Sequence, residues 1–352
     1  MKFLSKILLI FLLSSCANMV APTGGDKDVD APKLISTIDV ENMKHVNTRI
    51  VEFEFDEYIQ TNKWEEYFYI SPPIEKRVQK KIKGQTLSLT IEDTLAANTT
   101  YFLALNYCIK DINEGNILDT LNYIFSTSNN FDTLTISGSL KEAYSLKAIE
   151  NAWVMLFNEN IHDSLIFKKR PNYIAKTDKA GFFHFPNLNE ANYKIAALTD
   201  FDFIYNEEEK IAFFDKTINA VSDSFISLSA FDPIVMVDSI NTDTLITDTI
   251  KKEEILTGRL EIISSTNSSC IIQLLQNDNV IQESFFAQPS YIIENISPGK
   301  YQLKYIYDNN QDSSWTTGSW ERKTQAEKVI NYPGEITIRS NWDLKLEWLI
   351  EE

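Results

Sequence analysis

Alternating oxygen-bearing side chains mark a stretch of this chain that could bind a cation. The candidates share carboxylate or amide oxygens at every second position, and they are Asp308, Asn310 and Asp312, with Asp200 and Asp202 at the equivalent place of an internal repeat. Calcium-binding loops that begin this way carry glycine at the sixth position and a bidentate glutamate at the twelfth. Ser313 and Ser319 occupy those positions instead. We therefore expect an Asx-rich turn that closes a β-hairpin, and no bound metal.

Tryptophans gather toward the C-terminus. Four of the six in the chain lie there, at Trp315, Trp320, Trp342 and Trp348. An exposed indole can stack on a sugar ring or dock a partner, whereas a buried one packs a core or caps a strand. Trp315 and Trp320 are the candidates for a ligand platform, and the packing role is the one we favour.

Groups that could perform catalysis are scarce. His45, His162 and His184 lie far apart and lack the spacing of metal ligands, so we expect them at turn or strand surfaces. No Gly-x-Ser-x-Gly nucleophile motif and no glycine-rich phosphate loop occurs. We therefore predict no catalytic residues, no cofactor and no enzymatic activity. A hydrolase is a third possibility, because a glycosidase needs only two carboxylates and the chain has 50 acidic residues.

The N-terminal residues, 1–15, have the composition of an export signal. Lys2 and Lys6 precede seven apolar residues, 7–13, and two small serines follow. That order is typical of a secretory signal peptide, and seven apolar residues are too few to cross a bilayer. The tetrapeptide Leu13-Ser14-Ser15-Cys16 resembles the lipobox of bacterial lipoproteins.

The lipobox resemblance implies that lipid is attached to Cys16 and that cleavage leaves this cysteine as the first mature residue. Three acyl chains would hold the protein at a membrane almost permanently, since each buried CH₂ contributes about 0.8 kcal/mol. Residues 16–30 contain little apolar surface and several turn formers, so we expect a lipidated flexible tether. Ala17 after the cysteine resembles lipoproteins that are sent to the outer membrane, on its periplasmic face or at the cell surface.

The 337 residues (352 minus 15) that follow the predicted signal are strongly acidic. The formal charge of −17 becomes −19 without Lys2 and Lys6, and such a body is repelled by nucleic acid and by anionic lipid headgroups. The membrane contact is therefore expected through the lipid alone. The length exceeds what one hydrophobic core usually serves, so two or three domains are expected. Cys108 and Cys270 fall in different predicted domains, and we expect no disulfide between them.

Period-two alternation of apolar residues predicts strands in a first domain, 31–128. The clearest runs are Val51, Phe53 and Phe55, then Leu87, Leu89 and Ile91, then Tyr101, Leu103, Leu105 and Tyr107. Such alternation is typical of half-buried strands. Turn-forming residues separate about seven short runs, a pattern that favours an immunoglobulin-like sandwich.

Four motifs resemble the bacterial SbsA Ig-like domain over about residues 31–127. They are Phe53-Glu54-Phe55-Asp56-Glu57, Leu95-x-x-Asn98-Thr99-x-Tyr101-x-Leu103, Lys110-Asp111-x-x-x-Gly115-Asn116 and Phe125-Ser126-Thr127. Tyr101 follows a turn and opens its strand, so a buried ring with its hydroxyl bonded to nearby backbone would form a tyrosine corner. Cys108 is expected to face outward and to be unreactive, because no cluster of His or Lys in the nearby sequence would lower its pKa.

The rest of the chain contains an internal repeat with an offset of 108 residues. The matched positions include Phe183 with Tyr291, Asn187 with Asn295, Tyr193 with Tyr301 and Asp200 with Asp308. Residues 136–140 with 256–260, and 209–211 with 327–329, extend the match with changed loop lengths. We predict two related β-sandwich domains, 131–231 and 254–352, joined by an extended linker, 232–253.

Within each copy of the repeat, two consecutive strands around a tight turn are expected to form a hairpin. Residues 177–188 resemble the carboxypeptidase regulatory-like, or prealbumin-like, domains of exported proteins.

The sequence thus predicts an all-β protein of serial β-sandwich domains, one Ig-like and two related smaller ones, behind a lipoprotein signal peptide. The expected role is a non-catalytic binding, adhesion or spacer module, anchored to the outer membrane through Cys16, with an envelope protein or glycan as partner. The alternative is a carbohydrate-binding accessory lipoprotein of a glycan-uptake system, with the C-terminal aromatics as its platform. The family resemblance suggests a bacterium of the Bacteroidota type.

Overall fold

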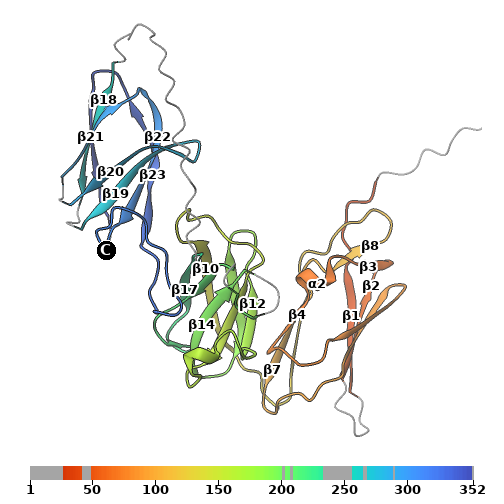
Figure 1. Ribbon diagram of the computed structural model, residues 1–352. Coiled ribbons are helices and arrows are strands. Elements are labelled where there is room, and N and C mark those ends of the chain that lie inside the picture. Colours follow the sequence, from red (N-terminus) through yellow and green to blue (C-terminus); the bar gives the residue numbers. More distant parts are fainter. Residues whose placement is uncertain are drawn as a thin grey trace, which may run out of the picture.

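Strands make up nearly all the regular structure of the computed structural model, which confirms the predicted all-β class (Figure 1). The structure describes residues 27–41, 49–199, 203–206, 209–232, 256–264, 268–287 and 290–350. The predicted signal peptide, Cys16 and almost all of the predicted linker lie outside the described residues. Helix within these ranges is limited to α2 (Trp64–Tyr67) and one 3-10 turn, η1 (Asp163–Leu165). No helix among the described residues is long and apolar enough to cross a membrane.

The first domain contains nine strands around one core. They are β1 (Leu34–Glu41), β2 (Arg49–Phe55), β3 (Ile59–Thr61), β4 (Tyr69–Ser71), β5 (Gln79–Lys83), β6 (Thr86–Ile91), β7 (Thr100–Ala104), β8 (Ile109–Asp111) and β9 (Asn122–Ser126). The sheets run in the orders β1-β2-β6-β5 and β4-β7-β9, and β3 pairs with β8. The predicted alternation is confirmed on β2, where Val51, Phe53 and Phe55 are at most 1% exposed. The alternation predicted about seven strands, fewer than the nine observed. Strands β3 and β8 were missed because, with three residues each, they are too short to show alternation.

Tyr101 forms the predicted tyrosine corner at the start of β7. Its ring is buried and stacks on Phe125 with a centroid separation of 5.1 Å. The Ala96 N–H donates to the Tyr101 hydroxyl oxygen over 2.8 Å. The hydroxyl therefore ties the preceding turn to the strand.

Replacing Tyr101 with phenylalanine should lower the free energy of unfolding by about 0.5–1.5 kcal/mol, because the Ala96 N–H loses its acceptor while the ring packing stays. Urea melts of the full chain measure the change. Tyr58→Phe is the matched control, since the Tyr58 side chain is 62% exposed, and it should leave the melt unchanged. An unchanged midpoint for Tyr101→Phe would show that the hydroxyl does not stabilise the corner.

Cys108 is buried in the first-domain core, so the prediction that it faces outward is wrong. Strand β7 ends at Ala104 and the chain then turns, with a left-handed φ of 61° at Tyr107. The Cys108 N–H donates to the Leu105 carbonyl over 3.0 Å within this turn, which breaks the alternation. Burial raises the pKa of the Cys108 thiol to about 12, so it is unreactive as expected. Cys270 is buried in another core, and both cysteines are free.

The second and third domains have the same strand order apart from β16, which has no counterpart among the described strands of the third domain. The second contains β10 (Leu134–Glu142), β11 (Trp153–Asn158), β12 (Tyr173–Lys176), β13 (Phe182–Leu188), β14 (Asn192–Leu198), β15 (Ile211–Phe213), β16 (Ile218–Asn219) and β17 (Phe225–Ala230). The third contains β18 (Gly258–Ser264), β19 (Cys270–Gln276), β20 (Asn279–Phe286), β21 (Ser290–Ile296), β22 (Gly299–Tyr307), β23 (Val329–Ile338) and β24 (Asp343–Trp348). One sheet has the order β13-β10-β17 in the second domain and β21-β18-β24 in the third. The other sheet contains β12-β11-β14-β15 in the second domain and β20-β19-β22-β23 in the third.

Backbone details repeat as well, within strands β13 and β21 and at the starts of β14 and β22. Asn187 and Asn295 both adopt left-handed φ angles, of 56° and 59°. The hydroxyl groups of Tyr193 and Tyr301 donate to the carbonyl oxygens four residues earlier, over 3.2 and 2.9 Å. Each domain of the repeat thus has its own tyrosine corner at the start of the corresponding strand, 108 residues apart.

Two details of the predicted repeat are wrong. Strands β13 and β14 form no hairpin, because the chain crosses from one sheet to the other between them, and β21 and β22 behave likewise. The matched glycines, Gly138 and Gly258, are not equivalent. Gly138 pairs with Phe183. Phe183 corresponds to Tyr291 in the repeat, and Tyr291 pairs with Ile262. Gly138 therefore corresponds to Ile262, which lies four residues after Gly258.

Candidate functional site

Strand β4 of the first domain lies near β12 of the second, and buried contacts fix this first junction. The Ile174 N–H donates to the Ser71 hydroxyl over 3.0 Å in the buried interface. The Tyr69 ring packs edge-on against Trp153 with a centroid separation of 5.5 Å. Burial raises the pKa of Tyr69 to about 12, so the ring stays neutral at physiological pH.

Lys176, at the end of β12, is a cation held within the first junction. Its ammonium donates to the Glu66 carbonyl in α2 and lies 4.5 Å from the centre of the Trp153 ring. The Asn151 amide reaches the Glu66 carboxylate at 3.5 Å. Burial lowers the pKa of Lys176 to about 8. Polar and aromatic contacts therefore hold the two domains at one angle.

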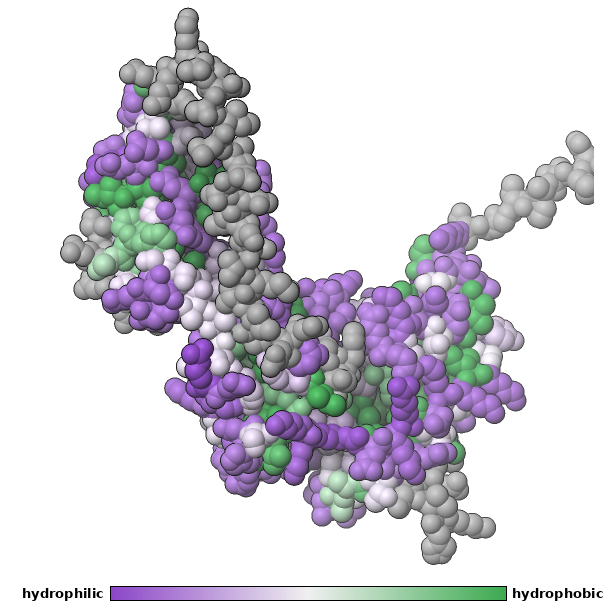
Figure 2. Space-filling view, viewed as in Figure 1, coloured by the Kyte–Doolittle hydropathy of each residue, from purple (hydrophilic) through white to green (hydrophobic). Residues whose placement is uncertain are grey.

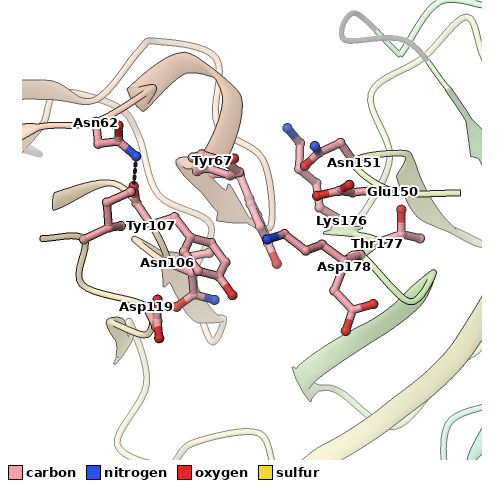
Figure 3. A pocket seen from close by; sticks show the side chains of 14 residues that line it. Asn62, Tyr67, Asn106, Tyr107, Asp119, Glu150, Asn151, Lys176, Thr177 and Asp178 are labelled. Atoms are coloured by element: carbon pink, nitrogen blue, oxygen red, sulfur yellow. Dashed lines mark hydrogen bonds between the residues drawn. The ribbon is translucent and has the colours of Figure 1, made fainter. Parts of the chain in front are cut away.

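A cavity of about 330 Å³ opens beside this junction, between the two domains (Figure 3). The first domain contributes Asn62, Tyr67, Asn106, Tyr107 and Asp119 to its wall. The second domain contributes Glu150, Asn151, Lys176, Asp178 and Lys179. None of the ligand-binding or metal candidates from the sequence lines this cavity. Its wall combines aromatic rings, amides and charges of both signs.

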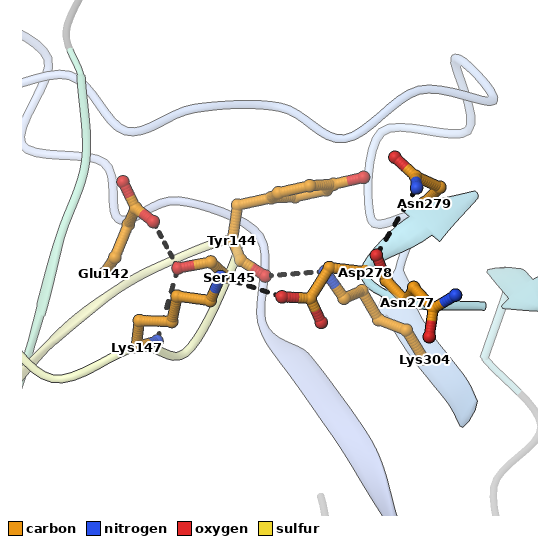
Figure 4. A network of polar contacts seen from close by, with 8 residues as sticks. All are labelled: Glu142, Tyr144, Ser145, Lys147, Asn277, Asp278, Asn279 and Lys304. Carbon is orange, nitrogen blue, oxygen red and sulfur yellow. Dashed lines mark hydrogen bonds and ion pairs between the residues drawn. The ribbon is translucent and has the colours of Figure 1, made fainter. Parts of the chain in front are cut away.

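The second junction is a polar clasp centred on Tyr144, in the turn after β10 (Figure 4). The Tyr144 hydroxyl lies 3.1 Å from Oε1 and 2.9 Å from Nε2 of Gln273 on β19. The Lys304 ammonium donates to the Tyr144 carbonyl over 3.2 Å and lies 4.0 Å from its ring centre. Burial lowers the pKa of Lys304. Lys147 and Asp278 add an exposed ion pair at 3.0 Å, which contributes little in water.

Both tryptophan candidates lie in a long loop of the third domain, residues 308–328, which we call the arm and which reaches over the second domain (Figure 1). Trp320 packs edge-on against Phe167 and Phe213, with centroid separations of 5.0 and 5.1 Å. Trp315 packs against the clasp tyrosine at 5.1 Å. The structure thus places both indoles against the second domain, where they pack between domains.

Further contacts seat the arm on the second domain. The Gln325 amide donates to the Phe213 carbonyl over 2.9 Å. Gly318 lies so close to Phe231 that a Cβ there would be 2.4 Å from the ring. The buried carboxylate of Glu327 accepts two backbone N–H bonds from the arm, of 2.8 and 2.9 Å, and so fixes the arm's shape.

The first residues of the arm are the predicted metal candidates. Both oxygens of Asp308 accept backbone N–H bonds, from Asp312 and Ser313, each over 3.1 Å. The Asn310 amide donates to Asp312 over 2.8 Å. The hydroxyl and N–H of Ser314 both donate to Asp312 over 2.8 Å, and these bonds hold the pKa of that carboxyl below its usual range. Among the described residues, no group of three His, Cys, Asp or Glu side chains could hold a metal ion.

Strands β22 and β23 on either side of this loop pair antiparallel, as in the predicted β-hairpin, but the whole arm lies between them. Asp200 and Asp202, the equivalent positions of the other copy, lie outside the described residues.

We expect calcium to leave the stability of the chain unchanged, because the Asp308 and Asp312 oxygens already serve the turn. A bound ion at 100 times its dissociation constant would add about 2.7 kcal/mol, a shift of several degrees in melting temperature. Calorimetry of the full chain in chelator and then in millimolar calcium separates the two cases. A large shift that disappears in Asp308→Asn and Asp312→Asn would establish a calcium site.

The two histidines that the structure describes lie at the surface, as predicted. His184 Nδ1 is 2.8 Å from the Ser137 hydroxyl, and His162 caps the short turn η1 through Ser164. His45 lies outside the described residues.

Residues 28–127 match the family model of the bacterial Ig-like domain. This stretch is therefore similar to bacterial Ig-like domains. The match spans all nine strands of the first domain, which contributes Tyr67 and Tyr107 to the wall of the cavity. The comparison with curated proteins found no match.

Several solved structures share a loose likeness with the chain. The minor pilin GBS52 of Streptococcus agalactiae is 12% identical, covers 62% of this chain and 95% of its own, and has a TM-score of 0.19. A fragment of alpha-2-macroglobulin from Escherichia coli is 10% identical, with coverages of 80% and 95% and a TM-score of 0.22. The S-layer protein rSbsC is 12% identical, with coverages of 89% and 41% and a TM-score of 0.20. Scores this low say nothing about function.

Proposed function

We propose that this protein is a non-catalytic spacer module of the bacterial cell envelope, built as a rigid series of three β-sandwiches. The observation that carries the proposal is that side-chain contacts fix both junctions. Domains of one chain that meet through small polar contacts are expected to move relative to each other. Aromatic contacts oppose that motion at both places, between Tyr69 and Trp153 and between Trp320 and Phe213. The second domain lies between the other two (Figure 1).

A lipid on Cys16 would hold this series of domains at the outer membrane. The support is the lipobox-like sequence and the polar tether after it, in the manner of an SbsA-type Ig-like lipoprotein. Hydrophilic residues cover most of the face seen in Figure 2, and the chain carries a formal charge of −17. A protein this acidic is not attracted to anionic headgroups, so the lipid alone would attach it to the membrane. The third domain, farthest along the chain from Cys16, would then be presented to a partner in the envelope.

Replacing Cys16 with alanine should abolish lipid attachment and leave the protein unprocessed or mislocalised, because the acylated thiol is lost. Labelling of cells with radioactive palmitate, followed by fractionation, measures both effects. Cys108→Ala is the control, since that thiol is buried in the fold and should leave labelling intact. Equal labelling of the Cys16 variant and its parent would contradict the proposed lipid anchor.

A carbohydrate-binding accessory role is the second candidate, and the composition of the cavity at the first junction favours it. The C-terminal aromatics predicted as its platform, Trp315 and Trp320, pack against the second domain instead. The cavity at the first junction has the aromatic and amide groups that such a role needs.

A further inference from the structure

Two tyrosines give the cavity at the first junction an apolar wall that water can reach. Tyr67 is the last residue of α2, and Tyr107 lies in the turn after β7. Their ring centroids are 5.5 Å apart and the planes are tilted by 55°. Tyr107 is 41% exposed and Tyr67 is half-buried. Rings in this setting suit a ligand with one apolar face and a polar rim.

Amide side chains line the same wall and are held in place before any ligand arrives. The Asn62 amide nitrogen donates to the Tyr107 carbonyl over 2.9 Å (Figure 3). The Asn106 amide oxygen accepts from the Leu121 N–H over 3.0 Å. An amide both donates and accepts, as a sugar hydroxyl does. Fixing these groups in advance lowers the entropic cost of binding.

Charges on the cavity wall nearly balance. The wall carries three carboxylates, of Asp119, Glu150 and Asp178, and two ammonium groups, of Lys176 and Lys179. An Asp178 carboxylate oxygen accepts two backbone N–H bonds of 2.9 Å, which set its position. A strongly charged ligand would meet repulsion from one set or the other, whereas a neutral polyhydroxylated ligand can bond to both.

We propose that this cavity binds a short neutral saccharide. The C–H face of a sugar ring packs on Tyr107, and its hydroxyls bond to the amides and carboxylates of the two domains. The volume, about 330 Å³, lies at the small end of the roughly 300–1,000 Å³ typical of ligand pockets, which limits the ligand to a short saccharide or the end of a longer one. This binding activity rests on the second candidate function, for which it names the site and the ligand class, and it depends neither on the spacer role nor on the lipid anchor.

Titration calorimetry of the mature chain, residues 16–352, tests the proposal with neutral trisaccharides of glucose, mannose, xylose and N-acetylglucosamine. We expect saturable binding of at least one of them at millimolar concentration or below. Tyr107→Ala removes the stacking face and Asp119→Asn removes an acceptor charge from an exposed position. Each should weaken binding about tenfold, equivalent to about 1.4 kcal/mol.

Tyr58→Ala is the matched control, because Tyr58 is an exposed tyrosine of the same domain that does not line the cavity, and it should bind like the parent. If Tyr107→Ala fails to fold, Asp119→Asn decides the matter alone. No binding of any of the four sugars, or binding that both cavity variants keep in full, would overturn the proposal. Binding of a tetralysine peptide that Asp119→Asn weakens, with no sugar bound, would identify a cationic peptide as the occupant and overturn it equally.

Discussion

Replacing Trp320 with alanine should destabilise the second junction by about 2–4 kcal/mol and free the third domain to move. Deletion of a buried Trp side chain costs about 3–5 kcal/mol, and the expected cost is about 1 kcal/mol lower because Trp320 is only half-buried. The lost contacts are those with Phe167 and Phe213. Small-angle X-ray scattering of the full chain should show a broader distribution of shapes, and denaturant melts should show an earlier loss of the third domain.

Trp342→Ala is the matched control for this experiment, since it deletes the same side chain where it is 56% exposed. It should change stability by about 0.5 kcal/mol or less and leave the scattering profile as it was. Unaltered scattering from Trp320→Ala would show that the arm does not hold the junction, and the proposal of a rigid series of domains would fail with it.

Gly138→Ala should destabilise the second domain by about 3 kcal/mol or more, the upper end of what overpacking costs. A Cβ at this position would lie 2.1 Å from the Ile226 carbonyl oxygen and 2.3 Å from the Phe183 ring. The nearest obstacle is backbone on the neighbouring strand β17, so the two strands must separate. Denaturant melts, or hydrogen exchange on β10 and β17, measure the loss.

Gly334→Ala on β23 is the comparison for this substitution. Its Cβ would meet nothing closer than 3.9 Å, from the Tyr332 ring, and stability should stay within about 0.5 kcal/mol. Equal losses in the two variants would mean that the effect comes from glycine as such, and that the close approach of β10 to β17 contributes nothing.

Much of the fold could be predicted because alternation, turn chemistry and repetition are local signals. Val51, Phe53 and Phe55 predicted their strand, and Tyr101 predicted its corner from its place after a turn. Sheet membership is different, because two consecutive strands look alike whether they pair or cross between sheets. That is why β13 and β14 were expected to form a hairpin, and why the crossing between Leu188 and Asn192 was missed.

The candidate site could not be predicted, because it forms only where two domains meet. Tyr67 and Tyr107 show no common spacing, and Lys176 enters from a strand about 70 residues later. The clustering of tryptophans near the C-terminus is visible in the sequence, but the residues that surround each indole in the fold are not. Whether Trp320 faces water depends on Phe167 and Phe213, which lie more than 100 residues earlier in the chain.

The parallel pairing of the first and last strands sets how the second domain would respond to a pull. Strand β10 begins where the chain enters the domain and β17 ends where it leaves, and parallel neighbours put these points at opposite ends. Tension along the chain would therefore run along both strands and load their six residue pairs together, from Ser137 with Phe225 to Glu142 with Ala230. Bonds loaded in shear must yield together, whereas those at the open end of a hairpin yield one by one. Under such tension, the lifetime of a domain built in this way would be governed by its rate of unfolding.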